Sequence, residues 1–525
     1  MLRTISSCLL ALALAPLANA TRYHVNLNAT GANIGSNWND AFVDLQSALS
    51  LAIPGDEIWV AAGVYKPTNN TDRTIAFALQ DGVDLFGGFA GGETELIQRD
   101  LANNITVLSG DIGQPGSIAD NSHTVVKANN ITTTITLDGF RIMSGNSGNG
   151  NNGGGVSATN ITNGLLIVKN CHIVRNTSQN YGGGIYLAAA RLTIENCLLE
   201  LNQTSGGSGG AICNGNNNGG YSSLTILDSR FTNNTARLGA CLYNTVRYED
   251  LVIDRCTFTN NTGSISLIEV DDFSSARMSN SYVIGNTVND FGGSVIRVNS
   301  FNEEDAFSMV NCTVVQNFNL YENGIQDEIV RLEDPQHRVT NCIIYKNTAY
   351  NDRQLNEQAQ VSYSIIEGGY PNGSNIIVSD PLFTTPYSSD PGNFDAIDYD
   401  YTLLPSSPAI NVGSDQAVID PYNRDLAQQP RIQGEVVDLG CYETDQTVAI
   451  METVHDTRWF FDPTRSELHL MDAMNGPRGT IAIHDMSGKL ITTIQPNARV
   501  HHLLLLTGAY VAVSPERGTL KFVVP

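Results

Sequence analysis

The stretch Val168–Asn176, VKNCHIVRN, recurs through the middle of the chain and decides the fold. Its template is an apolar residue, a spacer, usually Asn or Asp, then Cys or Ser, a spacer, an apolar residue, two spacers and Asn. Six further copies are IENCLLELN (194–202), ILDSRFTNN (226–234), IDRCTFTNN (253–261), MSNSYVIGN (278–286), MVNCTVVQN (309–317) and VTNCIIYKN (339–347). A weaker eighth copy, VSYSIIEGG, has Ser364 at the small position and Gly369 in place of the Asn.

The spacing of these copies predicts the architecture. Successive small residues are 22 to 32 positions apart, which is too irregular for a helical solenoid but suits rungs whose loops vary in length at one corner. We therefore expect an all-β chain. It should form a right-handed parallel β-helix, a pectate lyase-like solenoid, over residues 57–379, followed by a small C-terminal β-sandwich.

The small residues of the template are expected to stack in the core. Cys171 and Ile173 share a strand face because side chains alternate with a period of two, so both should point inward. The same holds for the other copies, and thiols can pack there as small hydrophobes. Five of the eight cysteines after Cys8 thus form a predicted ladder rather than a disulfide framework, although an even number in an exported protein would normally suggest disulfides. They are Cys171, Cys197, Cys256, Cys312 and Cys342.

The last residue of each copy predicts a second ladder, at the corner where the strand ends. An Asn side chain can bond neighbouring backbone groups, and its backbone tolerates the left-handed conformation. A structural role outweighs ligand binding for these residues. They are Asn176, Asn202, Asn234, Asn261, Asn286, Asn317 and Asn347. Glycine motifs such as GGGI (182–185) and GGSVI (292–296) then turn the chain into the next strand.

The alternation of GGA-I-like and F-x-x-N-like motifs, the latter present as FTNN, IVRN and IYKN, resembles the repeats of polymorphic outer membrane proteins. The resemblance covers roughly residues 139–369. It implies the β-helix fold but not a function, because this fold carries both enzymes and adhesins.

The two ends of the chain predict export. Arg3, the apolar stretch 8–17 and Ala18-Asn19-Ala20 read as a signal peptide over residues 1–20. No later segment is apolar for long enough to span a membrane. The formal net charge of −24 disfavours nucleic acid and anionic membranes as partners.

Residues flanking the solenoid are expected to cap it. An apolar helical face over 38–52 predicts an N-terminal plug within a cap at 21–56, with the first strands beginning at Asp56. Residues 380–446 resemble the closing segment of surface-anchored β-helices, often called a choice-of-anchor domain. A buried tie between an arginine and carboxylates is the expected role of its charged residues Asp425, Arg431, Asp438 and Glu443.

From about Thr447 the repeats stop and ordinary strand alternation begins. The stretches FFDPTRSELHL, GTIAIHDMSGKLI and LTGAYVAVSPERGTLKFVVP read as strands, with a hairpin turn at Ser487-Gly488. Residues 447–525 resemble the C-terminal sorting domain of type IX secretion. That implies the type IX machinery as a partner and an extracellular or outer-membrane location in a Gram-negative bacterium. Phe461-Asp462-Pro463 and the Val-Val-Pro end depart from that pattern, and a carbohydrate-binding β-sandwich is the alternative.

Motifs for catalysis are sparse. Asp271-Asp272 with Arg277 is the most suggestive cluster for a calcium-assisted polysaccharide lyase, and Glu303-Glu304-Asp305 follows one rung later. Asp271 and Asp272 are the candidate metal ligands, although such clusters are usually solvated loops. The sequence has no Gly-His-Gly, Gly-x-Ser-x-Gly or phosphate-loop motif.

We therefore expect no resident cofactor, with calcium as the one candidate, and a non-catalytic adhesin or glycan-contacting scaffold whose ligand is an extracellular glycan or a cell-surface molecule. The alternative is a polysaccharide lyase or glycosidase. An enzyme should bring carboxylates and an arginine together on adjacent rungs of one face, whereas a scaffold should not.

Overall fold

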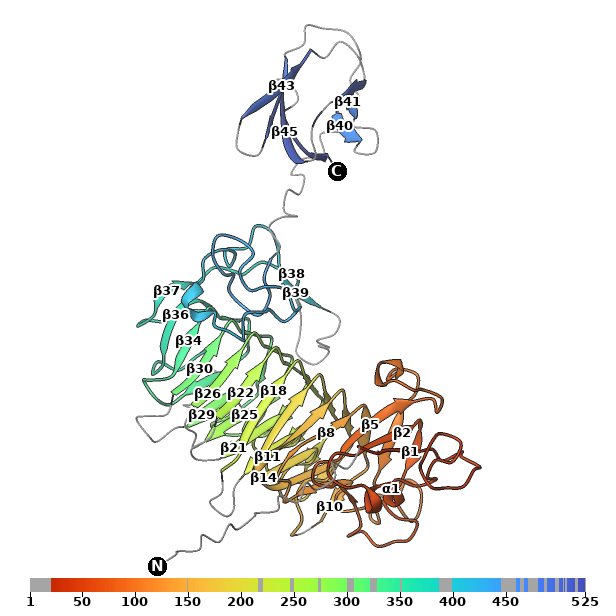
Figure 1. Ribbon diagram of the computed structural model, residues 1–525. Coiled ribbons are helices and arrows are strands. Elements are labelled where there is room, and N and C mark those ends of the chain that lie inside the picture. The colour runs from red at the N-terminus through yellow and green to blue at the C-terminus, as the bar shows by residue number, and fades with distance from the viewer. Residues whose placement is uncertain are drawn as a thin grey trace, which may run out of the picture. The chain divides into compact units, whose positions relative to one another are not determined.

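The computed structural model (Figure 1) describes most of residues 20–444 and the strands of the C-terminal part. The gaps before 444 are 149, 216–220, 246–249, 272–274, 300–305, 322–327, 350–351 and 387–398. Beyond 444 it describes 459–462, 467–470, 480–485, 489–495, 500–503, 505, 508–514 and 518–524. Several sequence predictions fall outside the described residues. They concern Asp272, 303–305, Pro463, Ser487-Gly488 and the signal peptide over 1–20, of which only residue 20 is described. The chain forms two compact units that meet in sequence between Thr444 and Asp445.

The first unit is the predicted parallel β-helix, and its strands stack along the axis in three faces. Face 1 comprises β1 Arg22–Val25, β2 Glu57–Ala61, β5 Asp84–Phe89, β8 Thr134–Asp138, the second halves of β11 Val156–Lys169 and β14 Ile185–Glu195, β18 Ser223–Leu227, β22 Asp250–Asp254, β26 Ser275–Ser279, β30 Ala306–Val310, β34 Arg338–Thr340, β36 Gln360–Ile366 and β37 Ser374–Ile377.

Face 2 follows face 1 in each rung, and its strands are short. They are β3 Gly63–Tyr65, β6 Thr106–Ser109, β9 Phe140–Met143, β12 His172–Val174, β15 Leu198–Glu200, β19 Arg230–Thr232, β23 Thr257–Thr259, β27 Tyr282–Ile284, β31 Thr313–Val315 and β35 Ile343–Tyr345.

A corner sheet of two-residue strands leads from face 2 to face 3. It contains β10 Asn146–Ser147, β13 Thr177–Ser178, β16 Gln203–Thr204, β20 Thr235–Ala236, β24 Thr262–Gly263, β28 Thr287–Val288 and β32 Phe318–Asn319. Face 3 contains β4 Phe77–Ala78, β7 Val126–Asn129, the first halves of β11 and β14, β17 Ile212–Gly215, β21 Leu242–Thr245, β25 Ser266–Asp271, β29 Ser294–Asn299 and β33 Val330–Leu332.

Both ladders lie in the core between the faces. The five template cysteines are buried, and the backbone N–H of Cys171 donates to Cys197 Sγ at 3.4 Å. In the Asn ladder, Asn261 Nδ2 donates to Asn286 Oδ1 at 2.9 Å and to Phe231 O at 2.9 Å, while Asn261 Oδ1 accepts from Asn234 N at 2.8 Å. Each side chain therefore ties its own rung to both neighbours.

The ladder asparagines, whose backbone tolerates the left-handed conformation, do not adopt it. The residue before each takes it, with φ from 50 to 68° at Arg175, Leu201, Asn233, Asn260, Gly285, Gln316 and Lys346. The residue before each Cys or Ser does the same, with φ from 49 to 56° at Asn170, Asn196, Asp228, Arg255, Asn280, Asn311 and Asn341. The bend falls one position earlier because the ladder side chain must point inward to reach the next rung.

The N-terminal plug is shorter than predicted. Only α1 Leu45–Leu51 is helical, with the Asp44 side chain accepting from Ser47 N at 2.8 Å as its N-cap. Trp38 lies outside it and packs against His24 and Phe89 instead, because loop hydrogen bonds hold the preceding residues out of a helix. The solenoid also begins earlier than expected, since β1 already pairs with β2.

The closing segment lies along the outer side of face 2 as well as after its last strand. Its short elements are β38 Phe383–Thr385, β39 Asp400–Leu403 and a 3-10 turn, η4 Asp415–Ala417; another such turn, η1, spans Leu96–Gln98. A second apolar cluster joins the two surfaces: Tyr282, Ile284, Val315, Ile343 and Ile365 of the solenoid pack with Phe383, Tyr401, Leu403, Ala409, Leu439 and Cys441.

The second unit is a small β-sandwich, as predicted. One sheet contains β40 Trp459–Asp462, β41 Glu467–Leu470 and β44 Val500–His502. The other contains β42 Ile481–Asp485, β43 Leu490–Ile494, β45 Gly508–Ser514 and β46 Gly518–Val524. Among the described residues of the chain, no helix is long and apolar enough to cross a membrane.

Candidate functional site

The outer side of face 3 carries a file of chemically active side chains. Tyr186, Cys213, Tyr243, Glu269, Arg297 and Arg331 pair in register from β14 to β33. Thr245, Asp271 and Asn299 form the neighbouring file, and Glu333 follows β33. We call these ten residues the outer strip. Because Ile268 and Val270 belong to the core, strand alternation turns Glu269 and Asp271 to the opposite side.

Glu269 lies at the centre of the outer strip and is only 1% exposed. Its Oε1 accepts from Arg297 Nη1 at 2.9 Å and from Asn299 Nδ2 at 3.1 Å. Its Oε2 is buried and accepts no hydrogen bond of ordinary length from the described residues. A buried carboxyl oxygen without a donor is suited to carry the proton of the neutral acid.

The electrostatics of the strip favour that neutral acid. Burial, and then the charge of Asp271, raise the pKa of Glu269 to about 7, although Arg297 opposes the shift. Burial and the same aspartate raise the pKa of Tyr243 to about 12. The carboxyl of Glu269 can therefore give up or take up a proton near neutral pH.

Asp271 shares a donor with Glu269. Asn299 Nδ2 bonds Asp271 Oδ1 at 2.7 Å and Glu269 Oε1 at 3.1 Å, so these two oxygens cannot lie more than about 6 Å apart. Two carboxyl groups in one site, one of which has a pKa raised by burial and by the charge of the other, are the usual equipment for acid–base chemistry.

Tyrosines lie at the end of the strip formed by β14 and β17, away from the two arginines. The rings of Tyr181 and Tyr186 stack with centroids 6.5 Å apart and an interplanar angle of 28°. Tyr181 pairs with Ser208 just before β14 and β17, so it borders the strip. Tyr181 and Tyr243 are partly exposed. Aromatic rings with a polar edge suit ligands that are apolar on one side and polar on the other.

The cluster expected from the sequence is only partly present. Asp271 lies in the outer strip and Asp272 lies outside the described residues. Arg277 lies on another face, where its Nη2 donates to Ala417 O at 3.4 Å and its guanidinium lies 5.3 Å from the ring centre of Tyr422. Over the described parts of the chain, no three His, Cys, Asp or Glu side chains gather closely enough to hold a metal ion.

Glu269, Arg297 and Asn299 were missed by the sequence reasoning. A usable signal exists in IEVD (268–271), IRVN (296–299) and VRLE (330–333), where charged or polar residues alternate with apolar ones after the glycine motifs. Such polar residues mark the outer side of a strand.

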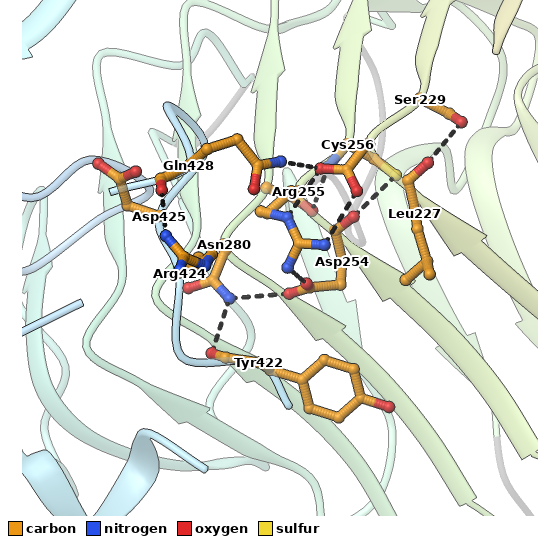
Figure 2. A network of polar contacts seen from close by, with 12 residues as sticks. Leu227, Ser229, Asp254, Arg255, Cys256, Asn280, Tyr422, Arg424, Asp425 and Gln428 are labelled. Atoms are coloured by element: carbon orange, nitrogen blue, oxygen red, sulfur yellow. Dashed lines mark hydrogen bonds and ion pairs between the residues drawn. The ribbon is translucent and has the colours of Figure 1, made fainter. Parts of the chain in front are cut away.

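A second polar network joins the closing segment to the solenoid (Figure 2). Arg255 donates to both carboxyl oxygens of Asp228, at 2.7 and 2.9 Å, and also pairs with Asp254. Asn280 Nδ2 bridges Asp254 Oδ1 at 2.8 Å and Tyr422 O at 3.1 Å, and Gln428 bonds Asp228. Every charge in this network has an opposite charge or an amide beside it, which is typical of a structural seam.

The four charged residues expected to form a buried tie do lie together. Arg431 Nη2 lies 3.5 Å from Glu443 Oε2 and donates to Asp438 O at 2.9 Å. Asp438 and Asp425 accept backbone N–H groups of the same segment. Burial raises the pKa of Glu443 to about 8 despite Arg431. These contacts hold the closing segment together from within.

No family model and no curated protein sequence matches this chain. Among solved structures it is similar to one titled "Crystal structure of pectate lyase Pel9A", at 13% identity, covering 82% of this chain and 97% of that one with a TM-score of 0.44. It is also similar to a rhamnogalacturonan lyase, at 11% identity, covering 66% of this chain and 87% of that one with a TM-score of 0.34. At these identities the likeness concerns the fold alone.

Proposed function

We propose that this protein cleaves an extracellular glycan, as a glycosidase or polysaccharide lyase, at the outer strip of face 3. The observation that carries the proposal is the meeting of Glu269 and Asp271 with Arg297 on two adjacent rungs. This is the arrangement that separates an enzyme from a scaffold in a β-helix. The helix offers a long side on which a polymer can lie across successive strands.

Turnover on a glycan panel tests the proposal. Release of new reducing ends or unsaturated products is followed for the full chain and for the variants Glu269→Gln and Asp271→Asn. Glu195→Gln is the matched control, because that carboxylate pairs with Lys169 on face 1, away from the strip. We expect both strip variants to lose at least about 100-fold in rate and the control to keep its rate. Equal activity in all four proteins would contradict the proposal.

A second candidate is the non-catalytic adhesin or glycan-contacting scaffold that the sequence suggests. The observation that favours it is the burial of Glu269, since an acid that is 1% exposed needs a rearrangement to reach a substrate. A scaffold would bind a glycan of the panel without releasing products, and the binding would survive Glu269→Gln.

We also propose export through type IX secretion to the cell surface or medium of a Gram-negative bacterium, with residues 1–20 as signal peptide and 447–525 as sorting domain. The separate C-terminal sandwich supports the proposal. Deleting 447–525 should leave the protein in the periplasm, and unchanged export would contradict it. Calcium stays a candidate ligand, and assays with calcium and with a chelator test it.

A further inference from the structure

The charges of the outer strip bear on the class of glycan, if the strip is the cleavage site proposed above. Each of its two arginines contacts a carboxyl group. Arg297 Nη1 lies 2.9 Å from Glu269 Oε1, and Arg331 Nη2 lies 2.5 Å from Glu333 Oε1. Asp271 adds a third carboxylate. With the Glu269 proton in place, Asp271 and Glu333 balance the two arginines, so the described residues of the strip have no surplus of positive charge, on a chain with a formal net charge of −24.

A polyuronate would meet unfavourable electrostatics on this surface. Each uronate brings a negative charge that needs a cation, and the strip has no surplus of positive charge, since Asp271 and Glu333 already balance Arg297 and Arg331. An uncharged sugar needs hydrogen bonds and a stacking surface instead. Two partly exposed tyrosines offer such a surface: Tyr243, which pairs with Glu269, and Tyr181, which borders the end of the strip that lacks the arginines.

The spacing of the carboxyl groups bears on the reaction. Retaining glycosidases hold their two carboxyl groups roughly 5–5.5 Å apart, whereas inverting ones leave roughly 6.5–9.5 Å for a water molecule. The shared Asn299 donor keeps the bonded oxygens of Glu269 and Asp271 within about 6 Å, which is nearer to the retaining spacing than to the inverting one. The buried Glu269 Oε2, which accepts no hydrogen bond of ordinary length from the described residues, is where the acid would carry its proton.

We infer that the outer strip hydrolyses an uncharged glycan with retention of configuration, with Glu269 as acid and base and Asp271 as nucleophile. In the first step an Asp271 oxygen bonds to the anomeric carbon, the glycosidic C–O bond breaks, and the Glu269 proton passes to the leaving oxygen. In the second step water attacks that carbon, its proton returns to Glu269, and the bond to Asp271 breaks. One water is consumed and no oxidant is needed.

The experiment compares neutral glycans (xylan, mannan, β-glucan and galactan) with anionic ones (polygalacturonate and alginate), each with calcium and with a chelator. Products are followed as reducing ends, as the ultraviolet absorbance of unsaturated sugars, and by proton NMR of the first anomer formed. We expect reducing ends from a neutral glycan, a retained first anomer, and no unsaturated product. Glu269→Gln should lose at least about 100-fold and Glu195→Gln should not.

The outcomes separate this inference from the proposed function. Unsaturated products from a polyuronate, lost in Glu269→Gln, would overturn the inference and leave a glycan-cleaving strip. An inverted first anomer from a neutral glycan would overturn the nucleophilic role of Asp271 and thus the inference. Absence of turnover on every glycan would overturn both. Binding can be measured independently of turnover by native gel electrophoresis. The Glu269→Gln variant should migrate more slowly through gels that contain the neutral glycan and at its usual rate through gels that contain the anionic ones.

Discussion

Glu269 couples the stability of the solenoid to pH. Its pKa in the folded protein is about 7, raised from an ordinary value of 4.5. The charged and titratable groups around it are Asp271 on its own strand, Tyr243 on β21, Arg297 on β29 and Arg331 on β33. Between pH 4.5 and 7 the unfolded chain loses this proton while the folded chain keeps it, so stability falls as the pH rises through that window and levels off above it.

We therefore expect Glu269→Gln to remove part of this pH dependence. The free energy of unfolding of the parent should fall by an amount on the order of 2 kcal/mol more than that of the variant between pH 4.5 and 7.5. Urea denaturation at several pH values measures the difference. Glu443, whose pKa is raised to about 8, contributes with the same sign in both proteins and cancels in the comparison. Parallel curves for the two proteins would show that Glu269 is ionised throughout.

The Asn ladder predicts a large loss from one truncation. Asn261→Ala removes the acceptor of Asn234 N and Nδ2 and the donor to Phe231 O, all of which are buried. Buried groups left without partners should cost about 3 kcal/mol or more, measured by denaturant unfolding. Thr257→Ala, on the partly exposed side of the same rung, should cost less than about 1 kcal/mol. Similar values for the two variants would contradict the ladder as a main source of stability.

Residues differ in how far their roles can be predicted from sequence. The ladders follow from the template because every copy repeats the same inward positions. Arg297 and Glu269 are 28 residues apart, and their contact depends on loop lengths that shift one rung against the next. Of the strip, only Asp271 was predicted as a site residue, because two adjacent acids indicate a candidate metal site. A single Glu between apolar residues carries no such signal.

At the scale of elements, local conformation was harder to predict than strand order. The apolar pattern over 38–52 favours a helix, yet only Leu45–Leu51 forms one, since the side chains of Asp40 and Asn33 accept backbone hydrogen bonds that hold a loop before Asp44. The backbone conformation at the corners was also hard to predict. Asn is the obvious left-handed residue, but Arg175, Leu201 and Lys346 take that conformation because the stack of rungs imposes it.

The closing segment predicts a local unfolding event. Leu439 is 1% exposed and packs in the cluster that covers face 2. Leu439→Asp should cost about 3 kcal/mol or more, because a buried charge without a partner is expensive. We expect proteases to cut between residues 380 and 444 and a hydrophobic dye to bind the uncovered face, while the solenoid stays protected.

The matched control for that change is Leu404→Asp, because Leu404 belongs to the same segment but is 37% exposed. It should leave protease resistance and dye binding unchanged. If Leu439→Asp resists proteases and excludes the dye as well as Leu404→Asp does, the cover of face 2 does not depend on this apolar contact. The polar seam around Asp228 and Arg255 would then hold the segment alone.

At the scale of the whole molecule, the cysteines show how the chain is stabilised. All eight described cysteines are buried as free thiols, and no cysteine follows Cys441 in the sequence, so no disulfide can link the two units. Burial raises the pKa of Cys441 to about 12 and that of Cys256 well above its usual range. A thiol is nucleophilic only as the thiolate, so these side chains should be inert in the folded protein.

The last prediction follows from this inertness. A reducing agent should leave the thermal midpoint of a chain that starts at Thr21 unchanged, because hydrophobic stacking and the Asn ladder, not cross-links, hold the rungs. A thiol reagent should find almost no reactive group in the native protein and eight after unfolding in guanidinium. Reaction of the native chain, or a midpoint that falls on reduction, would show that some of these cysteines pair across rungs and that disulfides contribute to the stability of the helix.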